Sequence, residues 1–365
     1  MLLVTFHGGS GVSGINNVSA YSTSGDSYST LLTAQALDTP ESVTLSELRA
    51  MFLANNMLYV ANGAKSQSTV LAFALPAPPA STFAYASTLI GPTLSSTKDH
   101  FKTSIAHPFG IVFEDEATCF VSNQDTNVVS GVTVGPGGLG GSLGHGCHSD
   151  YLKKKYPKGS FLDGTYVASQ VGQLPDIDSH DIPTDVDADF GGLGVSFEHK
   201  KVKNSVRDVA IANGVLFVCD EPDKVVSLDA LADGRYIGKS IALPEGPTHL
   251  AINDGGLYIS AGSNLYWGQL PQSSSPSLSL QAITPLPSSR DEVKHDTVKI
   301  GGIAFDGAST VYIPYQTGTG GNNPGGSIYR YSVGSQTPPA LIDGAAFATS
   351  LTDTPEFLLY YSGGE

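Results

Sequence analysis

One pattern, repeated along the chain, constrains the fold more than any other feature. It is an apolar strand, a tight turn of Gly, Asn or Asp, and a second apolar strand; its clearest copy, residues 205–221, reads SVRDVAIANGVLFVCDE. The Asn213-Gly214 pair suits a two-residue type I′ turn, because that turn needs positive φ at both central residues. Four more copies occupy residues 48–62, 108–123, 247–262 and 301–315. The sequence therefore predicts a protein built from repeated β-hairpins.

The spacing of the copies is typical of a β-propeller. Apart from one interval lengthened by an insertion at about residues 135–200, the copies fit a four-stranded unit of roughly 40 to 50 residues, the period of a propeller blade. A sixth, partial copy would combine residues 345–362 with residues 2–6, and this pairing would close the ring without a free sheet edge. We predict an all-β, single-domain chain over residues 1–365, a six-bladed β-propeller with seven blades as the alternative.

The insertion at about residues 135–200 is expected to combine long loops with one strand of its blade. Residues 135–146 are almost all Gly, Leu, Ser and Pro, which predicts a flexible loop. A strand over residues 164–170 is expected to complete the blade, and residues 176–189 form a strongly acidic loop. Long loops inside a compact domain are usually functional lids or disordered segments.

Composition limits the classes of partner. The net charge is −15 with only 19 Lys and Arg residues, which argues against nucleic acid or an anionic membrane, because both require basic patches. No apolar run reaches the length of a transmembrane helix. We therefore expect a small-molecule partner, with the oligomeric state left open.

Two further features bear on the origin and redox state of the chain. Met1 directly precedes the first strand, and Asn17-Val18-Ser19 is a glycosylation sequon; both favour a secretory-pathway origin. The three cysteines allow at most one disulfide, and its pairing is left open. Cys119 and Cys219 lie in predicted hairpin strands, where a small buried thiol is expected, whereas Cys147 lies in the insertion.

Propeller geometry selects candidate site residues without a catalytic motif. The innermost strand of each blade starts, and the second strand ends, at the same mouth of the central channel, so side chains at both places converge on the axis. From the strand starts we predict four catalytic residues: Arg49, His107, Arg207 and His249. From both sets we predict these substrate-binding residues: Asn62, Phe109, Asn123, Asp220, Lys299, Tyr315, Gln316 and Tyr361. Arginine, histidine and aromatic groups around one mouth are typical of a small-molecule pocket. The alternative is that some of them cap backbone groups or join neighbouring blades, as Arg207 and Asp208 would.

Sequence motifs for other chemistries are incomplete. The segment His145-Gly146-Cys147-His148 has no second ligand pair at a usual zinc spacing. The glycine-rich segments contain no Gly-Lys-Ser or Gly-Lys-Thr, and the chain has no Gly-x-Ser-x-Gly elbow. No metal or phosphate-binding loop is therefore predicted from motifs.

The repeats resemble the propeller superfamily of NHL-repeat, strictosidine-synthase-like and SMP-30/gluconolactonase-like proteins. The closest fragments are Glu245-Gly246-Pro247 and Pro108-Phe109-Gly110-Ile111. The gluconolactonase resemblance implies a divalent metal on the axis, held by a Glu, Asn and Asp set. Here Phe109 stands at the Asn position, and Ser122-Asn123 stands where Ser-Asp is expected. No cofactor is therefore predicted, and Ca or Zn would be expected only in a lactonase.

The general composition, rich in Ala, Ser, Thr, Gly and Pro, also resembles divergent fungal propellers that include secondary-metabolite hetero-Diels–Alderases. This resemblance implies a cofactor-independent cyclase or lyase with an axial pocket for an organic small molecule. Three alternatives remain open: an SMP-30-like lactonase or esterase with a divalent metal, a lyase of uronate-bearing saccharides that uses Arg49 or Arg207 for the carboxylate, and a non-catalytic binding propeller.

Overall fold

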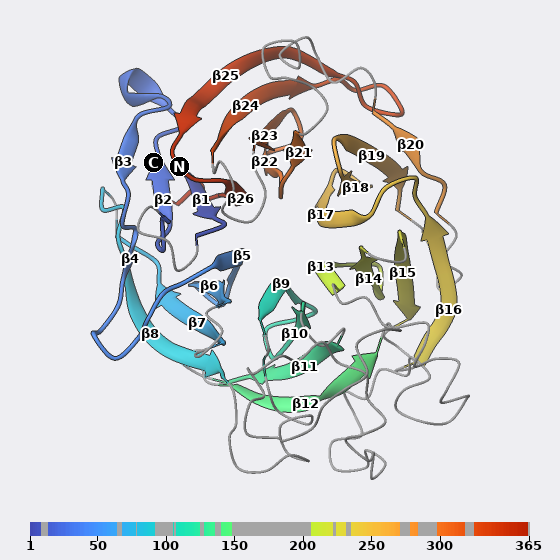
Figure 1. The fold of residues 1–365 in the computed structure, drawn as a ribbon, viewed down its shortest axis with the longest axis horizontal. Helices are drawn as coiled ribbons and strands as arrows, with labels where there is room; N and C mark the ends of the chain where they lie inside the picture. The colour runs from blue at the N-terminus through green and yellow to red at the C-terminus, as the bar shows by residue number, and fades with distance from the viewer. Residues whose placement is uncertain are drawn as a thin grey trace.

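Six antiparallel sheets are arranged as blades around a central axis in the computed structural model (Figure 1). The structure describes the whole chain except residues 9–13, 64–67, 78, 92–104, 106, 125–127, 136–139, 148–205, 222–223, 231–234, 271–277, 284–297, 318–324 and 364–365. Its helical content in the described part is one 3-10 turn, Gly25–Ser27. The predicted fold class, an all-β six-bladed propeller, is confirmed.

In blades 1 to 5 the main strands run outward in chain order from the innermost one, whereas blade 6 takes its innermost strand from the last strand of the chain and the others from the first three. Blade 1 contains β5 (Leu48–Ala54), β6 (Met57–Asn62), β7 (Thr69–Ala74) and β8 (Phe83–Ile90), with the short β4 (Leu37–Asp38) parallel to β8. Blade 2 contains β9 (Pro108–Phe113), β10 (Thr118–Asn123), β11 (Val128–Val134) and β12 (Gly140–Cys147). Blade 3 contains β13 (Val206–Ala212), β14 (Val215–Asp220), β15 (Val225–Ala230) and β16 (Arg235–Ala242).

The remaining blades include the two chain ends. Blade 4 contains β17 (Pro247–Asn253), β18 (Gly256–Ala261), β19 (Asn264–Gln269) and β20 (Gln281–Ala282). Blade 5 contains β21 (Lys299–Ile300), β22 (Ala304–Asp306), β23 (Thr310–Gln316), β24 (Gly326–Val333) and β25 (Leu341–Leu351). Blade 6 contains β26 (Pro355–Tyr360), β1 (Leu2–Phe6), β2 (Ser19–Tyr21) and β3 (Leu31–Thr33).

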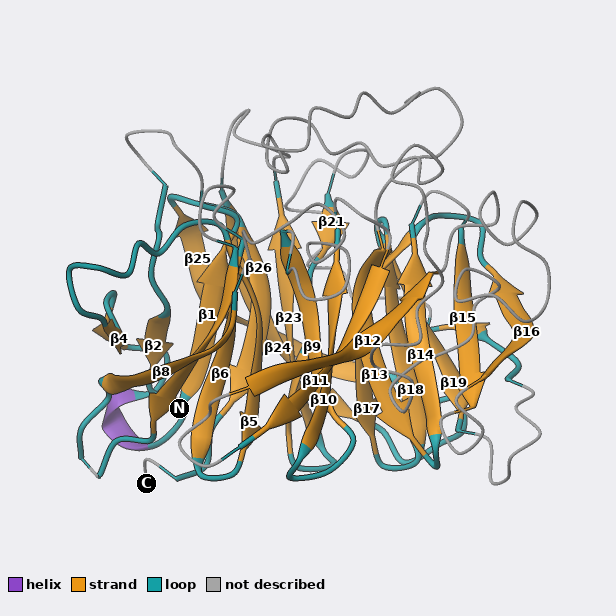
Figure 2. Cartoon of the chain, turned by 90° about the horizontal axis from the view of Figure 1, so that it is seen from below, coloured by secondary structure: helices purple, strands orange, loops and turns teal. Residues whose placement is uncertain are grey.

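The inner hairpins of blades 1, 3 and 4 have the predicted turn geometry, with positive φ at both central residues. Asn213 and Gly214 have φ values of 52° and 72°, as a type I′ turn requires. These turns define one mouth of the axis, which we call the hairpin mouth; the first residues of the inner strands define the other, the strand-start mouth. Figure 2 shows both chain ends near the hairpin mouth.

Two expectations about the strands were wrong. Residues 140–147, expected to be part of a flexible loop, form β12, which pairs with β11 along its length. Main-chain hydrogen bonds hold an outer strand, so it needs no apolar pattern. The predicted strand at 164–170 lies outside the described residues. In addition, residues 345–351 belong to β25, the outer strand of blade 5, and only β26 joins the closing blade.

Ring closure depends on β1, as predicted. Leu3 of β1 pairs with Leu359 of β26 and with Ala20 of β2. The Leu3 side chain is fully buried in a cluster with Leu58 and Phe73 of blade 1. The first blade in the sequence is thus packed against a sheet made from both chain ends.

We expect Leu3→Ala to lower the free energy of unfolding by about 2–5 kcal/mol, because it leaves a cavity where the last blade meets the first. The measurement is urea denaturation followed by the fluorescence of Trp267, the single tryptophan. Leu31→Ala is the matched control, since Leu31 lies in the same blade but is 48% exposed; its expected change is within about 0.5 kcal/mol. Equal losses of unfolding free energy in the two variants would contradict a stabilising role for the contact between blades 6 and 1.

Both cysteines in the predicted hairpin strands are part of the packed interior. Cys119 and Cys219 are free and buried, as expected, and burial raises the pKa of both thiols. Among the described residues, none of the helices has the length and hydrophobicity needed to span a membrane.

Candidate active site at the strand-start mouth

Irregular pairing at the start of the inner strands directs side chains towards the axis. The register shifts between Leu48 and Met51 of β5, between Val206 and Val209 of β13, and between Pro247 and His249 of β17. A bulge of this kind inserts an unpaired residue and redirects the side chains around it. Arg49, Arg207 and Thr248 lie within the shifted stretches.

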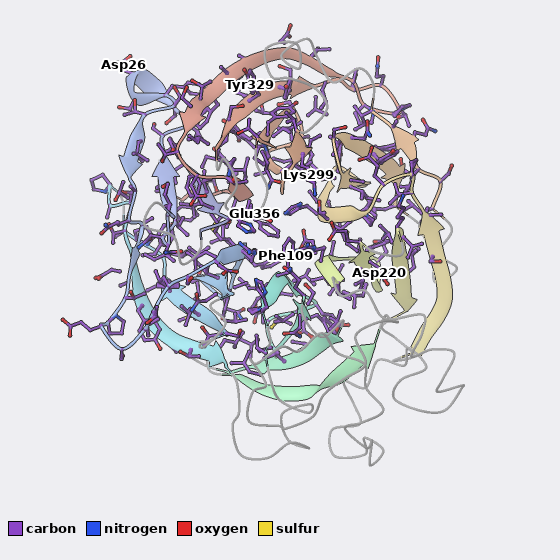
Figure 3. The ribbon with its side chains drawn as sticks, viewed as in Figure 1. Asp26, Phe109, Asp220, Lys299, Tyr329 and Glu356 are labelled. Carbon is purple, nitrogen blue, oxygen red and sulfur yellow. The ribbon has the colours of Figure 1, made fainter. Side chains whose placement is uncertain are left out.

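These starts bring together a group of side chains that we call the axial cluster. It contains all four predicted catalytic residues and one predicted substrate-binding residue, together with three partners, from five of the six blades. Its members are His7, Glu47, Arg49, His107, Phe109, Arg207, His249 and Glu356. Figure 3 shows Phe109 and Glu356 near the axis.

Phe109 is the aromatic centre of the cluster. Its ring is fully buried, and the guanidinium carbons of Arg207 and Arg49 lie 4.9 and 5.9 Å from its centroid. The ring also lies 5.2 Å from Phe357 and 5.4 Å from His249, measured between centroids. Guanidinium groups at these distances are attracted to the aromatic face. Two positive charges are therefore held next to one apolar surface.

Glu47 joins two of the predicted catalytic residues. Its carboxylate lies 3.1 Å from Nε2 of His107 and 3.4 Å from a terminal nitrogen of Arg49. Arg49, only 1% exposed, also donates to the carbonyl of His7 at 3.0 Å. Burial alone would raise the pKa of Glu47, but the hydrogen bond from His107 and the charges of His107 and Arg49 lower it below the ordinary value. Glu47 is therefore ionised near neutral pH.

Glu356 is the second carboxylate of the cluster and is more deeply buried. It lies 3.3 Å from Nδ1 of His7, 3.5 Å from the amide nitrogen of Gln316 and 3.9 Å from Nε2 of His249. Burial opposes its ionisation, but the hydrogen bond from His7 and the charge of Arg49 outweigh burial and hold its pKa well below the usual range. A permanent negative charge therefore lies beside His249.

His249 is neutral and has a defined tautomer. Burial lowers its pKa to about 4, against the attraction of Glu356. The Thr248 hydroxyl donates to the Ser260 carbonyl, so its oxygen can only accept from Nδ1 of His249, 2.9 Å away. Nε2 therefore carries the lone pair. This atom is buried and has no hydrogen-bond partner among the described residues. His249 thus offers a neutral nitrogen base next to two guanidinium groups.

Three members of the cluster are partly accessible. The side chain of His7 is 33% exposed, that of Glu47 21% and that of Arg207 20%. Arg207 donates from Nε to Glu221 at 2.8 Å, which leaves its terminal nitrogens near the Phe109 ring. A ligand at this mouth would meet these three side chains first.

The remaining predicted site residues divide into three groups. Gln316 adjoins the cluster, donating to the carbonyl of Pro355 at 2.9 Å, and Lys299 is exposed at the start of β21. Asn62, Asn123 and Asp220 are buried at the ends of second strands. Asn62 binds the connection before β5, since its amide donates to the Thr44 carbonyl and its oxygen accepts from Ser46 N.

Two predicted tyrosines are not brought to this site. Tyr315 lies in the core of blade 5, where its hydroxyl is 2.8 Å from that of Tyr331. Tyr361 follows β26, an innermost strand, and its ring contacts Phe83 at the hairpin mouth. The prediction for Tyr361 is wrong because residues 345–362 do not form one hairpin: residues 345–351 belong to blade 5 and β26 to blade 6.

Glu356 and His7 were missed for the same reason. A usable signal was present, because three inner strands begin with proline: Pro108-Phe109, Pro247-Thr248 and Pro355-Glu356. Alignment on proline places Glu356 at the position of Phe109. His7 follows the end of β1, the second strand of its blade.

Comparisons with known proteins support the fold. No protein-family model and no curated protein sequence matches the chain. A protein from Lactobacillus plantarum is similar in structure, with a TM-score of 0.55, 11% identity, and coverage of 94% of this chain and 81% of that one. Proteins from Bacteroides fragilis and Bacteroides uniformis, both provisionally described as 6-phosphogluconolactonases, each have a TM-score of 0.50 and the same coverages, with 12% and 11% identity. At such identities the likeness establishes the propeller fold alone.

Proposed function

We propose that the axial cluster is the active site of a cofactor-independent enzyme that acts on an organic small molecule by a lyase- or cyclase-type step. The observation that carries the proposal is His249, a buried neutral histidine whose Nε2 lies 3.9 Å from a carboxylate and whose pKa is also lowered by the charges of Arg207 and Arg49. Perturbed titratable groups with specific charged partners are typical of functional sites.

Each group has a distinct role in this proposal. Nε2 of His249 accepts a proton from the substrate, and Glu356 stabilises the imidazolium that results. Arg207 and Arg49 stabilise negative charge that develops on a substrate oxygen, an effect that is strong where water is excluded. Phe109 holds the guanidinium groups of Arg207 and Arg49 in place beside His249. His107 and Glu47 form a second acid–base pair at the accessible side of the cluster.

Within this reaction class, the specific activity that we propose is that of a cyclase of hetero-Diels–Alderase type. Such a catalyst works chiefly by orienting a reactive intermediate, for which hydrogen-bond donors held in fixed positions are suited. His249 would take the phenolic proton of an ortho-hydroxybenzyl alcohol and return it to the departing benzylic hydroxyl, which leaves as water. The arginines would polarise the carbonyl oxygen of the quinone methide that results.

Lactone hydrolysis is the second candidate, because two structural neighbours are provisionally described as 6-phosphogluconolactonases. Its metal-dependent form does not fit this cluster. Among the described residues, no group of three or more His, Cys, Asp or Glu side chains could hold a metal ion. Glu47 and Glu356 are instead engaged by cationic and imidazole groups. We therefore derive no step through a metal.

The test compares turnover of three substrate classes: an ortho-hydroxybenzyl alcohol, which gives an ortho-quinone methide on loss of water, with an alkene partner; 6-phosphogluconolactone; and an oligogalacturonate. We expect turnover of the first class and a loss of about 10²-fold or more in kcat/KM for His249→Phe, which keeps the ring packing but removes the base. Arg207→Gln and His107→Ala should each lower the rate as well. Tyr331→Phe, outside the cluster, is the control.

Two outcomes would overturn the proposal. One is a folded His249→Phe variant with unimpaired turnover of the substrate that the wild type converts. The other is turnover confined to the lactone or the oligogalacturonate, which would assign a lactonase or a uronate lyase. Circular dichroism and the unfolding midpoint of each variant separate lost chemistry from lost folding.

A further inference from the structure

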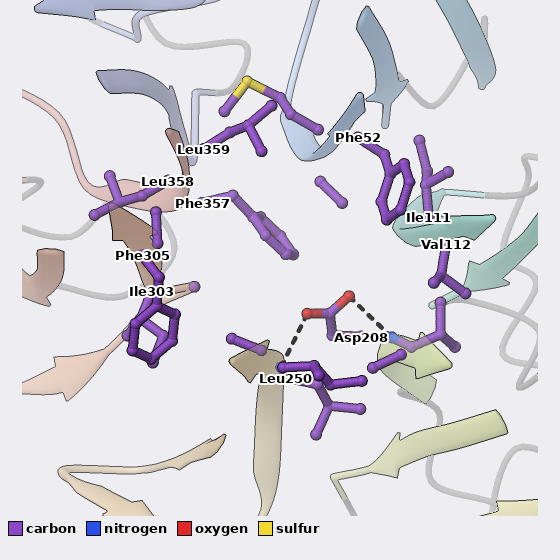
Figure 4. Close-up of a pocket in the computed structure, with 18 of the residues that line it drawn as sticks. Phe52, Ile111, Val112, Asp208, Leu250, Ile303, Phe305, Phe357, Leu358 and Leu359 are labelled. Atoms are coloured by element: carbon purple, nitrogen blue, oxygen red, sulfur yellow. Dashed lines mark hydrogen bonds between the residues drawn. The ribbon is translucent and has the colours of Figure 1, made fainter. Parts of the chain in front are cut away.

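A separate cavity lies on the axis towards the hairpin mouth. Its volume is about 460 Å³, and its walls come from the inner strands of all six blades. The lining is largely aliphatic and aromatic, and among the described residues that form it Asp208 is the only charged one. Figure 4 shows the Asp208 carboxyl group among the apolar lining side chains. We call this cavity the apolar channel.

The channel opens through an apolar rim. Phe52, Phe113 and Phe305 line it near the inner hairpin turns and are half-buried, while Ile252 is 36% exposed. Phe52 and Phe113 stack with their ring centroids 5.3 Å apart. The rim and the inner hairpin turns between β5 and β6, β9 and β10, β13 and β14, and β17 and β18 lie entirely within the described residues.

The inner end of the channel borders the axial cluster without belonging to it. Phe357 lines the channel, and its ring contacts His249 at 4.5 Å and Phe109 at 5.2 Å between centroids. Neither His249 nor Phe109 lines the channel. A ligand in the channel would therefore approach from the opposite mouth to a substrate at the axial cluster.

Asp208 provides the polar end of the channel. It is 5% exposed, and its two carboxyl oxygens accept from the backbone nitrogens of Val209 and Leu250, each at 2.9 Å. Asp208 has no ion-pair partner among the described residues, because the neighbouring Arg207 is engaged by Glu221 and Phe109. Each carboxyl oxygen has two lone pairs, so each retains one acceptor position. A buried acceptor in an apolar space favours a ligand that supplies a hydrogen-bond donor.

We propose that the apolar channel binds an apolar organic molecule with one terminal hydroxyl group, inserted from the hairpin mouth with the hydroxyl on Asp208. The apolar body of the ligand packs against the aliphatic and aromatic walls. A carboxylate head is excluded, because it would place a second negative charge beside Asp208 with no cation to balance it.

A neutral head also fits better than an ammonium. Burial raises the pKa of Asp208 to about 7, against the two backbone hydrogen bonds, so near neutral pH the carboxyl group is partly protonated. A hydroxyl group can donate to the ionised form and accept from the protonated form, whereas an ammonium can only pair with the ionised form. The low polarity that disfavours charge on Asp208 disfavours a buried ammonium equally.

The test uses four probes with the same body at pH 7: 3-phenylpropan-1-ol, 3-phenylpropylammonium, 3-phenylpropanoate and propylbenzene. Binding is followed by NMR of ¹³C-labelled isoleucine δ1 methyl groups. Ile111, Ile211, Ile252 and Ile303 line the channel, whereas Ile259 and Ile313 are buried between blades and serve as internal controls. We expect the alcohol to shift the four channel methyls and to bind at least about tenfold more tightly than each other probe, since one hydrogen bond to a buried acceptor is worth about that factor.

Three variants test whether the probes bind in the apolar channel and whether Asp208 contacts the hydroxyl group. Ile211→Trp should fill the channel and abolish the shifts, while Ile342→Trp, at a 48% exposed position on β25, should leave them unchanged. Asp208→Asn should reduce the preference for the alcohol over propylbenzene. If that variant does not fold, Ile211→Trp and the probe series still decide the question.

Three results would overturn the proposal: no shift of the channel methyls with the alcohol, equal affinity for the alcohol and propylbenzene, or tighter binding of the ammonium or carboxylate. None of these results bears on turnover at the axial cluster. Failure here and failure of the proposed function are therefore distinguishable.

Discussion

Replacing Glu356 by Ala is expected to lower the free energy of unfolding by about 3–5 kcal/mol at pH 7. The Glu356 carboxylate is ionised and buried, and it joins His7 after β1, Gln316 at the end of β23, and the positive charge of Arg49 in blade 1. Removing one partner of a buried charged network leaves the other charge without compensation, which is the costly case. Arg49 would lose the attraction of Glu356 and would keep its ion pair with Glu47.

The expected loss from Glu356→Ala depends on pH in a defined direction. The pKa of Glu356 is lowered by folding, so its stabilisation is complete above the unfolded value of about 4.5 and decreases as the pH falls towards the folded value. Urea denaturation at pH 7 therefore measures the full effect.

Two further variants serve as comparisons for Glu356→Ala. Glu221→Ala breaks the Arg207–Glu221 pair in the same region, but both side chains are 20–27% exposed, so a loss of about 1 kcal/mol or less is expected. Glu356→Gln keeps the shape and should retain part of the hydrogen bonding, with an intermediate loss. If Glu356→Ala cost no more than Glu221→Ala, the carboxylate would not be a structural centre of the axis.

The second large effect is an opposed pH dependence of stability from Asp208 and His249. The pKa of Asp208 is raised by burial from 3.8 to about 7, so acidification below pH 7 adds a proton to the folded state first and stabilises it. The pKa of His249 is lowered by burial from 6.5 to about 4, so acidification below pH 6.5 protonates the unfolded state first and destabilises the fold. Between pH 6.5 and 4.5 the two effects nearly cancel.

Single variants should reveal the separate contributions of His249 and Asp208 to the pH dependence of stability. Relative to wild type, His249→Phe is expected to gain about 2–3 kcal/mol of stability between pH 6.5 and pH 4.5, because one pKa unit corresponds to about 1.36 kcal/mol. Asp208→Asn is expected to lose a similar amount over the same interval. The measurement is the difference in unfolding free energy from wild type at each pH, which removes the contribution of other carboxyl groups. Parallel curves for all three proteins would contradict the burial of both groups.

Much of the fold could be predicted because short stretches of sequence determine the strands and turns of each hairpin. Alternating apolar strands fixed the inner hairpins of blades 1 to 4, supported by an Asn-Asn turn in blade 1, Asn-Gly in blade 3 and Asp-Gly in blade 4. Asn213-Gly214 has the expected positive φ values. The strand-start rule then placed Arg49, His107, Arg207 and His249 together without any motif. These successes share one cause: each rests on the order of residues within a single hairpin.

The errors arose where pairing is non-local. β12 is a strand of mostly glycine and polar residues, and it forms because β11 presents an unpaired edge. β26 closes the ring by pairing with β1, more than 350 residues away in sequence, and this pairing set the position of Glu356 and moved Tyr361 to the other mouth. No local pattern in the sequence shows that β25 is the outer strand of blade 5 while β26, which follows it, is the inner strand of blade 6.

By itself, the sequence determined the hairpin unit, the propeller class and the mouth at which charged residues gather, because turn chemistry and apolar alternation act over a few residues. Only the tertiary structure decided the ionisation of those residues. Neighbouring blades bury His249 and Asp208 and bring the pKa of one to about 4 and of the other to about 7. It also decided that the axis holds a charged cluster at one mouth and an apolar channel at the other, since both are lined by strands from different blades.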